Sequence, residues 1–274
     1  MPYAKNAIDG SRIYFEDDGG ETSPIVFHGG FLDSVMTMRN ADLAQALRDE
    51  FRLIYVDHRG LGRSDKPRDA EAYAMPLRVA DAVAVLDELG IERAHFIGLS
   101  WGGRLVFGIG EHAPERVRSL VISGQQPYKW PDTPLSRVIT AALDAAQTEG
   151  MEVLVQAMED LWGLRFPEGL REHYLDNDPA ALQAALTKVL AEGPISENLQ
   201  AWRIPCLIFV GQRDTDFASL ARRAAEEIPD AEFLSLIDTD HIGAHLGQSG
   251  PVVDAVRRTI RRGDSASAQR QHRA

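Results

Sequence analysis

The stretch that decides the fold is Gly98-Leu99-Ser100-Trp101-Gly102, which has the pattern G-x-S-x-G. An apolar run typical of a strand, residues 94–97, enters this stretch, and a run typical of a helix leaves it. A serine in a sharp turn between a strand and a helix has a strained backbone, and small residues two before and two after it prevent clashes with neighbouring elements. The pattern therefore predicts that the hydroxyl of Ser100 is exposed as a nucleophile.

Apolar runs typical of strands alternate with helical patterns along most of the chain. From the third run onward they are apolar throughout, as in parallel strands that are covered on both faces. Between two of them, residues 76–89 carry apolar side chains at helical spacing and complete a β-α-β unit. We therefore predict a doubly wound, mostly parallel sheet flanked by helices, with the early runs as antiparallel edge strands. The predicted strands are 12–15, 25–27, 53–56, 95–97, 120–122, 207–210 and 233–237.

The alternation stops between about residues 126 and 202, where helical patterns follow one another without a strand. The clearest of these helical segments are 135–148, 151–162 and 179–191. Because the strand pattern resumes at Cys206, we interpret residues 126–202 as a helical lid inserted into a core formed by residues 1–125 and 203–262. Residues 263–274 have no apolar side chain larger than alanine, and we expect a disordered tail.

Composition excludes several classes of protein. The 274 residues carry a formal net charge of −12, and binding to nucleic acid needs clustered Lys and Arg, so we expect no nucleic-acid partner. The single cysteine excludes an intramolecular disulfide framework. No run of about 18 apolar residues is present, and the first residues lack the order of a signal peptide. We therefore expect a cytoplasmic protein with no membrane partner.

A serine hydroxyl needs a base that removes its proton and an acid that orients the base. In a parallel sheet such groups meet at the carboxyl ends of the strands. The candidate acid is Asp214, which follows the predicted strand 207–210, and Asp216 is the alternative. The candidate base is His241, which follows the next predicted strand, and His245 is the alternative.

Attack on a carbonyl group also creates an oxyanion, which backbone N–H groups must stabilise. Gly30 lies in His28-Gly29-Gly30-Phe31, directly after a predicted strand, where glycines let the backbone approach a substrate closely. We expect the N–H groups of Gly30 and Trp101 to form the oxyanion hole. Six aromatic or methionine side chains are candidates for an apolar substrate pocket. They are Phe31, Tyr128, Trp130, Met158, Trp162 and Phe166.

These parts, in this order, closely resemble the α/β-hydrolase fold family over about residues 8–125 and 203–262. The parts that carry the resemblance are the loop that contains Gly30, the turn from Asp57 to Ser64, the G-x-S-x-G stretch, Asp214 and His241. The resemblance implies that Ser100 is the nucleophile, Asp214 the acid and His241 the base. It also implies that Asp57 and Arg59 fix neighbouring loops through hydrogen bonds. Asp240 stands where many relatives have a glycine before the histidine.

The resemblance also limits the reaction, because the epoxide hydrolases and haloalkane dehalogenases of this fold use aspartate where this chain has Ser100. It implies a serine hydrolase that cleaves a small, partly apolar carboxylic ester or lactone through an acyl-enzyme, with no cofactor and no metal. Alternatives on the same triad are a carbon–carbon bond hydrolase, a cofactor-free perhydrolase, and a lyase or synthase. A ligand receptor that retains the pocket is an alternative of another class. The sequence does not determine the physiological substrate, and it does not decide whether the protein forms a homo-oligomer.

Overall fold

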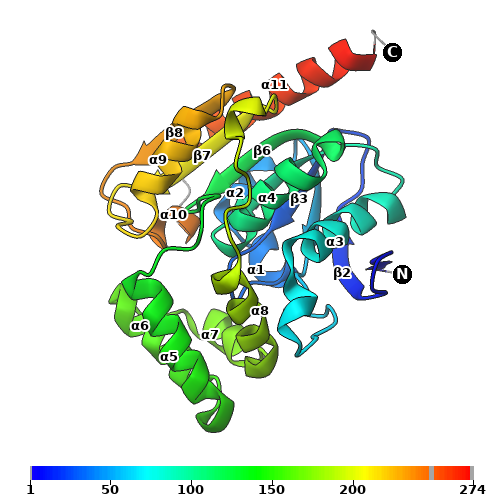
Figure 1. Cartoon of the computed structure of the whole chain (residues 1–274). Helices are drawn as coiled ribbons and strands as arrows, with labels where there is room; N and C mark the ends of the chain where they lie inside the picture. Colours follow the sequence, from blue (N-terminus) through cyan, green and yellow to red (C-terminus); the bar gives the residue numbers. More distant parts are fainter. Residues whose placement is uncertain (1, 247–249, 272–274) are drawn as a thin grey trace.

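The structure, a computed structural model, describes residues 2–246 and 250–271 (Figure 1). Within these residues, eight strands form one sheet in the order β1-β2-β4-β3-β5-β6-β7-β8. Their bounds are β1 Tyr3–Lys5, β2 Arg12–Asp17, β3 Pro24–His28, β4 Arg52–Val56, β5 Ala94–Leu99, β6 Val117–Ser123, β7 Cys206–Gly211 and β8 Ala231–Leu236. β1 pairs antiparallel with β2 and β2 antiparallel with β4, whereas β4, β3, β5, β6, β7 and β8 pair in parallel. The predicted mostly parallel sheet with antiparallel edge strands is therefore confirmed.

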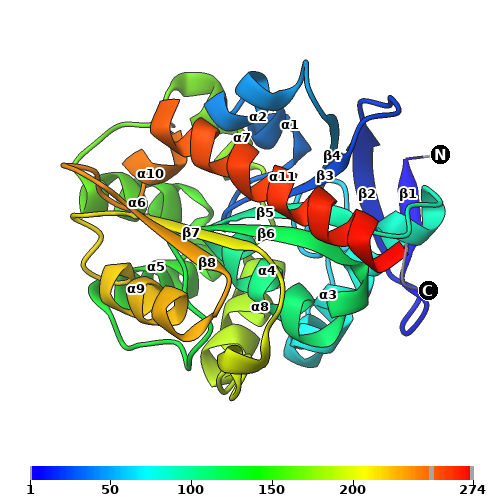
Figure 2. The ribbon, with the colours of Figure 1, turned by 90° about the horizontal axis from the view of Figure 1, so that it is seen from above.

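Helices cover both faces of the sheet (Figure 2). On one face lie α1 Val35–Arg39, α2 Asp42–Leu47 and α11 Gly250–Gln271, and on the other lie α3 Met75–Glu88, α4 Trp101–His112 and α9 Ala218–Glu227. Short helical turns occur at Ala70–Tyr73, Pro114–Arg116 and Leu199–Ala201, and α10 spans Gly243–Leu246. Each face has its own cluster of buried apolar side chains. The strands β3, β4, β5, β6 and β7 are thus buried almost throughout, as their apolar runs predict, whereas the edge strands β1, β2 and β8 are partly exposed.

Between β6 and β7 the described chain forms four helices, at the bottom of Figure 1. They are α5 Pro134–Glu149, α6 Glu152–Trp162, α7 Glu168–Leu175 and α8 Pro179–Ala191. A third apolar cluster joins these helices to core side chains that include Leu32, Leu61 and Trp101. The buried guanidinium of Arg104 donates to the carbonyl oxygens of Tyr128 (3.0 Å) and Gly193 (3.3 Å), near the two ends of this segment. The helical segment is therefore packed onto the core beside the G-x-S-x-G turn.

Asp57 and Arg59 act as the resemblance implies. The carboxylate of Asp57 accepts the backbone N–H groups of Val35 (2.6 Å) and Arg63 (2.7 Å), while Arg59 pairs with Asp81 at 2.6 Å. These contacts connect the loops after β3 and β4 to each other and to α3.

The expectation of a disordered tail is wrong for residues 263–271, which continue α11. The carboxylate of Asp264 accepts hydrogen bonds from Ser23 (2.9 Å) and Arg118 (2.8 Å) and lies 3.2 Å from Nε2 of the buried His95. Nδ1 of His95 in turn lies 2.7 Å from Oγ of Ser119. A polar network therefore attaches this segment, which has few apolar side chains, to the core. Residues 272–274 of the predicted tail lie outside the described residues.

Candidate active site

Ser100 lies in a sharp turn between β5 and α4, and its backbone has φ 48° and ψ −110°. A Cβ atom on Gly98 would come within 2.4 Å of the carbonyl oxygen of Gly102, and one on Gly102 within 2.2 Å of the carbonyl oxygen of His28. Carbon atoms do not approach carbonyl oxygens this closely, so both positions need glycine. The small residues two before and two after the serine are therefore explained by direct contact with the backbone.

The hydroxyl of Ser100 lies beside an imidazole and a carboxylate that come from two other strand ends. Oγ of Ser100 donates to Nε2 of His241 at 3.0 Å, and Nδ1 of His241 donates to Oδ2 of Asp214 at 2.7 Å. The other oxygen of Asp214 accepts the backbone N–H of Phe217 at 3.2 Å. Asp214 is 3% exposed and His241 is 7% exposed, so water competes little for these hydrogen bonds. Three predicted residues that are far apart in the sequence thus form one connected array.

Of the two candidate acids, Asp214 is the hydrogen-bond partner of His241. Burial, together with the nearby charge of Asp214, raises the pKa of the Asp216 carboxyl. Asp240, which precedes the histidine, accepts the backbone N–H of Gly243 at 2.7 Å and so begins α10. The alternative base, His245, belongs to α10, but its side chain lies outside the described residues.

The loop after β3 lies against the serine, but the backbone N–H of Gly30 in this loop already has a hydrogen-bond acceptor. A Cβ atom on Gly30 would lie 3.9 Å from Cβ of Ser100, so Gly30 is close enough to help bind a reacting carbonyl. However, the N–H of Gly30 donates to Oδ2 of Asp33 at 2.7 Å, and Oδ1 of Asp33 accepts the hydroxyl of Tyr174 at 3.2 Å. The sequence reasoning missed Asp33. Its signal is an aspartate in a loop, which commonly accepts a hydrogen bond from a nearby backbone N–H.

Three of the predicted pocket residues come from α6 and the loop that follows it. The indole of Trp162 stacks on the imidazole of His241, with ring centroids 6.4 Å apart and planes at 15°. Phe166 meets Trp162 edge-on at 6.2 Å, and Met158 is buried in the same apolar cluster. The helical segment therefore covers one side of the candidate base.

Phe31, Trp101 and Trp130 form a second aromatic row beside the serine. The ring of Trp101 lies 5.2 Å from that of Phe31 and 6.3 Å from that of Trp130. Trp130 meets the ring of Phe217 at 5.6 Å, and Phe217 lies 5.3 Å from the imidazole of His241. Phe217 was not among the predicted pocket residues. It is a single phenylalanine close to the candidate acid in sequence, and nothing in the local sequence distinguishes it from a core residue.

Tyr128, in contrast, lies away from these rows. Its ring packs against the core under α9, where the guanidinium of Arg223 lies 4.4 Å from the ring centroid. Burial raises the pKa of its hydroxyl. Tyr128 therefore packs against the core and α9 rather than in the rows formed by Trp162 and by Trp101, and its place in the substrate pocket stays a prediction.

Two buried histidines lie behind the candidate site. The rings of His28 and His58 are 5.2 Å apart. Burial lowers the pKa of His58 to about 3 and holds that of His28 well below its ordinary value. Both rings are therefore uncharged at neutral pH and add no positive charge beside the serine.

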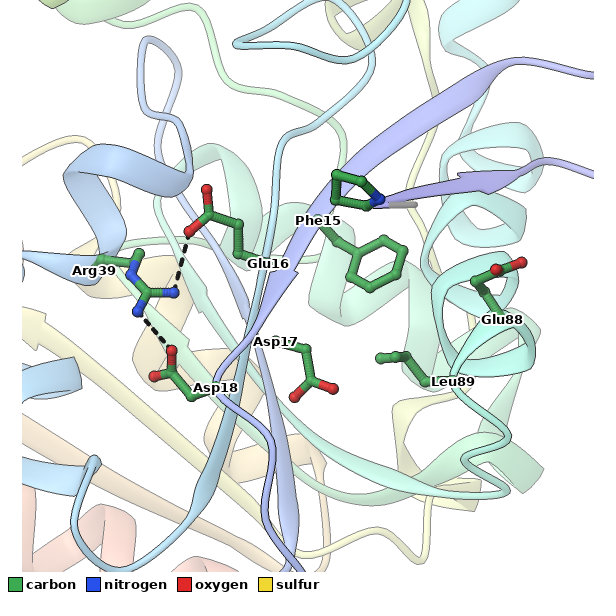
Figure 3. Close-up of a pocket in the computed structure, with 8 residues that line it drawn as sticks. Phe15, Glu16, Asp17, Asp18, Arg39, Glu88 and Leu89 are labelled. Carbon is green, nitrogen blue, oxygen red and sulfur yellow. Dashed lines mark hydrogen bonds and ion pairs between the residues drawn. The ribbon is translucent and has the colours of Figure 1, made fainter.

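A cavity of about 650 Å³ lies on another part of the molecule, at the end of β2 (Figure 3). Arg39 forms ion pairs there with Glu16 (3.1 Å) and Asp18 (2.6 Å). Because β2 is antiparallel to β4, with Asp17 opposite Ile54, this end of β2 lies beside the beginning of the parallel strands. The cavity thus lies near the amino ends of the parallel strands, whereas Ser100 lies at their carboxyl ends.

Among residues 2–246 and 250–271, no group of three or more His, Cys, Asp and Glu side chains is arranged to hold a metal ion. In the same part of the chain, no helix combines the length and the apolar character needed to cross a membrane.

Comparison with known proteins agrees with the architecture. Residues 23–151 match a family model described as the α/β-hydrolase fold. The chain is 38% identical to bifunctional epoxide hydrolase 2 of Mus musculus over 46% of its length, and it spans only 22% of that protein. It is 26% identical to 3-oxoadipate enol-lactonase 1 of Acinetobacter baylyi, with 75% of this chain and 77% of the lactonase covered.

A solved structure is similar over nearly the whole chain. The thermophilic esterase of Thermogutta terrifontis superimposes with a TM-score of 0.79 at 25% identity, covering 96% of this chain and 98% of the esterase. The order of strands and helices is therefore shared far beyond the G-x-S-x-G turn.

Proposed function

This chain is an α/β-hydrolase fold protein, and we propose that it is a serine hydrolase that cleaves a small, partly apolar carboxylic ester or lactone. The observation that carries the proposal is the array Ser100–His241–Asp214, with hydrogen bonds of 3.0 and 2.7 Å. Acyl transfer through a covalent intermediate requires a nucleophile that is hydrogen-bonded to a base, and a base that is hydrogen-bonded to an acid.

In the proposed reaction, Oγ of Ser100 attacks the carbonyl carbon while Nε2 of His241 takes the hydroxyl proton. The tetrahedral intermediate collapses, and His241 gives this proton to the leaving alkoxide, which departs as an alcohol. His241 then removes a proton from water, and the resulting hydroxide attacks the acyl carbon. When this second intermediate collapses, the bond to Oγ of Ser100 breaks, Oγ takes the proton back from His241, and the carboxylic acid is released. Asp214 keeps the proton on Nδ1 and stabilises the imidazolium in both half-reactions.

The proposed oxyanion hole consists of the N–H groups of Trp101 and Gly30. Trp101 is the first residue of α4, so its N–H lies in the helix turn whose N–H groups have no partner within the helix. The N–H of Gly30 has to exchange the carboxylate of Asp33 for the oxyanion. The reaction on this site therefore includes a local movement of Asp33.

We further propose that residues 126–202 act as a lid. Trp162 covers one face of the His241 imidazole, and the apolar cluster shared with the core keeps water from the reacting groups. The similarity to an esterase and an enol-lactonase supports acyl-oxygen bonds as the target. Phe31, Trp101 and Trp130 offer an apolar surface next to Ser100, which fits a partly apolar substrate.

The test is a screen of 4-nitrophenyl esters, lactones and thioesters against the wild-type protein and Ser100→Ala. Ser265→Ala, at an exposed serine of α11, is the matched control. We expect sustained turnover of at least one ester or lactone, a loss of about 10³-fold or more in Ser100→Ala, and full activity in the control. Equal turnover by the wild-type protein and Ser100→Ala contradicts the proposal.

A further inference from the structure

A cavity of about 410 Å³ lies between the α1–α2 segment and the beginning of α7. Its volume falls within the range of about 300 to 1,000 Å³ that is usual for small-molecule sites. The large apolar side chains of its lining are Met36, Met38, Leu99 and Leu170. Leu99 directly precedes Ser100, so one residue of the catalytic turn forms part of the wall of this cavity. None of these four residues was among the predicted pocket residues.

Asp33 belongs both to the wall of this cavity and to the surroundings of the serine. One carboxylate oxygen accepts the N–H of Gly30 at 2.7 Å, and the other accepts the hydroxyl of Tyr174, from α7, at 3.2 Å. Gly30 lies against Ser100, because a Cβ atom on Gly30 would be 3.9 Å from Cβ of Ser100. Asp33 is therefore the side chain at which the cavity and the catalytic centre meet.

The charged side chains among the described residues that line the cavity are Asp33 and Asp42. Both are acids, and the lining includes no Lys, Arg or His. A carboxylate placed in this cavity would lose part of its water and meet two carboxylates and, among the described lining residues, no positively charged side chain, which is unfavourable in a partly enclosed site. An uncharged alkyl chain would instead exchange water for contacts with the methionine and leucine side chains.

We propose that this cavity binds the apolar acyl group of the ester substrate, and that Asp33 selects uncharged acyl groups against those that carry a carboxylate. The inference rests on the proposed serine hydrolase function. It adds to that function a binding site on the α1–α7 side of Ser100 and a chemical class of substrate, an ester of an uncharged medium-length fatty acid.

The first test fills the cavity. Gly169 lines it and lies in the first turn of α7, where a Cβ atom would have no neighbour within 4 Å. Gly193 has the same free space but lies outside the cavity lining, so Gly193→Trp is the matched control. We expect Gly169→Trp to lower the ratio of kcat/KM for 4-nitrophenyl hexanoate to that for the acetate by about tenfold. The same ratio in Gly169→Trp and in Gly193→Trp would overturn the assignment of the cavity.

The second test changes the charge. We expect the wild-type protein to prefer 4-nitrophenyl hexanoate to the mono-4-nitrophenyl ester of glutaric acid, which is similar in length but anionic, by about tenfold or more in kcat/KM. Asp33→Asn keeps an oxygen that can accept the N–H of Gly30 and removes the charge, so this preference is expected to fall severalfold. Asp49→Asn, at an exposed position, is the control. A preference that is unchanged in Asp33→Asn refutes the role of Asp33, since a merely structural role would alter both substrates alike.

Binding without turnover separates the two proposals. Absence of both ester and lactone hydrolysis by the wild-type protein means that the proposed function is wrong, and the cavity is then tested by calorimetry on the Ser100→Ala protein. Methyl hexanoate is expected to bind more tightly than monomethyl glutarate, and adding Gly169→Trp is expected to weaken the binding of methyl hexanoate. Equal binding of both esters, or binding that Gly169→Trp does not change, overturns the inference whether or not the protein hydrolyses esters.

Discussion

Oδ2 of Asp214 lies 2.7 Å from Nδ1 of His241, and both side chains are almost completely buried. This contact fixes the tautomer of His241 that presents an unprotonated Nε2 to Ser100. We expect Asp214→Asn to lower kcat by about 10⁴-fold with little change in KM, because an amide can stabilise the opposite tautomer and cannot balance an imidazolium charge. Steady-state kinetics on the best ester of the screen measures this.

The neighbouring Asp216 supplies the control for that prediction. Asp216→Asn is expected to retain most of the activity, because Asp216 is not the hydrogen-bond partner of Nδ1. Similar losses in the two variants would show that the 2.7 Å contact has no special role.

We expect that the glycines of the catalytic turn cannot be replaced without loss of stability, because a side chain would contact the backbone directly. A Cβ atom on Gly102 would lie 2.2 Å from the backbone oxygen of His28, whereas one on Gly169 would meet nothing within 4 Å. We expect Gly102→Ala to lower the free energy of unfolding by about 1 to 3 kcal/mol, since backbone atoms have to shift. Gly169→Ala is the control and is expected to be neutral or slightly stabilising. Urea unfolding compares the two, and equal midpoints for both variants argue against the contact.

The C-terminal part of α11 gives a prediction about pH. Burial alone would raise the pKa of Asp264, but hydrogen bonds from His95, Arg118 and Ser23 and the charge of protonated His95 lower it from 3.8 to about 2. A lowered carboxyl pKa stabilises the folded protein above about pH 4, and this stabilisation is lost as the pH falls through about 2. Because Asp264 is 36% exposed, solvent screening reduces the effect, and we expect Asp264→Asn to cost about 1 kcal/mol at pH 7.

Unfolding curves of the wild-type protein and Asp264→Asn between pH 7 and about 2 test the sign of this effect. The difference between the two proteins should shrink over the lower part of that range. Asp254→Asn, at an exposed position of the same helix, should match the wild-type protein throughout. A difference for Asp264→Asn that stays constant down to the lowest pH would mean that its charge does not hold the helix.

The stacking of Trp162 on His241 predicts a role for the helical segment. We expect Trp162→Ala to lower kcat/KM by about tenfold, because water then reaches the imidazole and competes for its hydrogen bonds. Trp162→Phe retains an aromatic face and should recover most of the loss. Activity in Trp162→Ala equal to that of the wild-type protein would argue against a covering role for α6.

The strands and the triad residues could be predicted because their signals are local. Continuous apolar runs mark the parallel strands, and Asp214 and His241 each follow such a run directly. The glycines around Ser100 are required by contacts that the pattern encodes.

What was missed depends on contacts between distant parts of the chain or on short elements. α1 and α2 have five and six residues, and α7 has eight residues with a largely polar sequence, so none shows a clear helical period. Residues 263–271 continue α11, and Asp264 in this segment contacts His95, which is 169 residues away in the sequence. Likewise, the contact between Asp33 and Tyr174, 141 residues apart, cannot be read from either local sequence.

The most direct test of the central claim, that His241 activates Ser100 as a nucleophile, is covalent labelling with a fluorophosphonate followed by intact-mass and peptide mass spectrometry. The account predicts one adduct per chain, located on Ser100, and a labelling rate that falls by about 10³-fold or more in His241→Ala. Labelling at another residue, or equally fast labelling of Ser100 in the wild-type protein and His241→Ala, would contradict it.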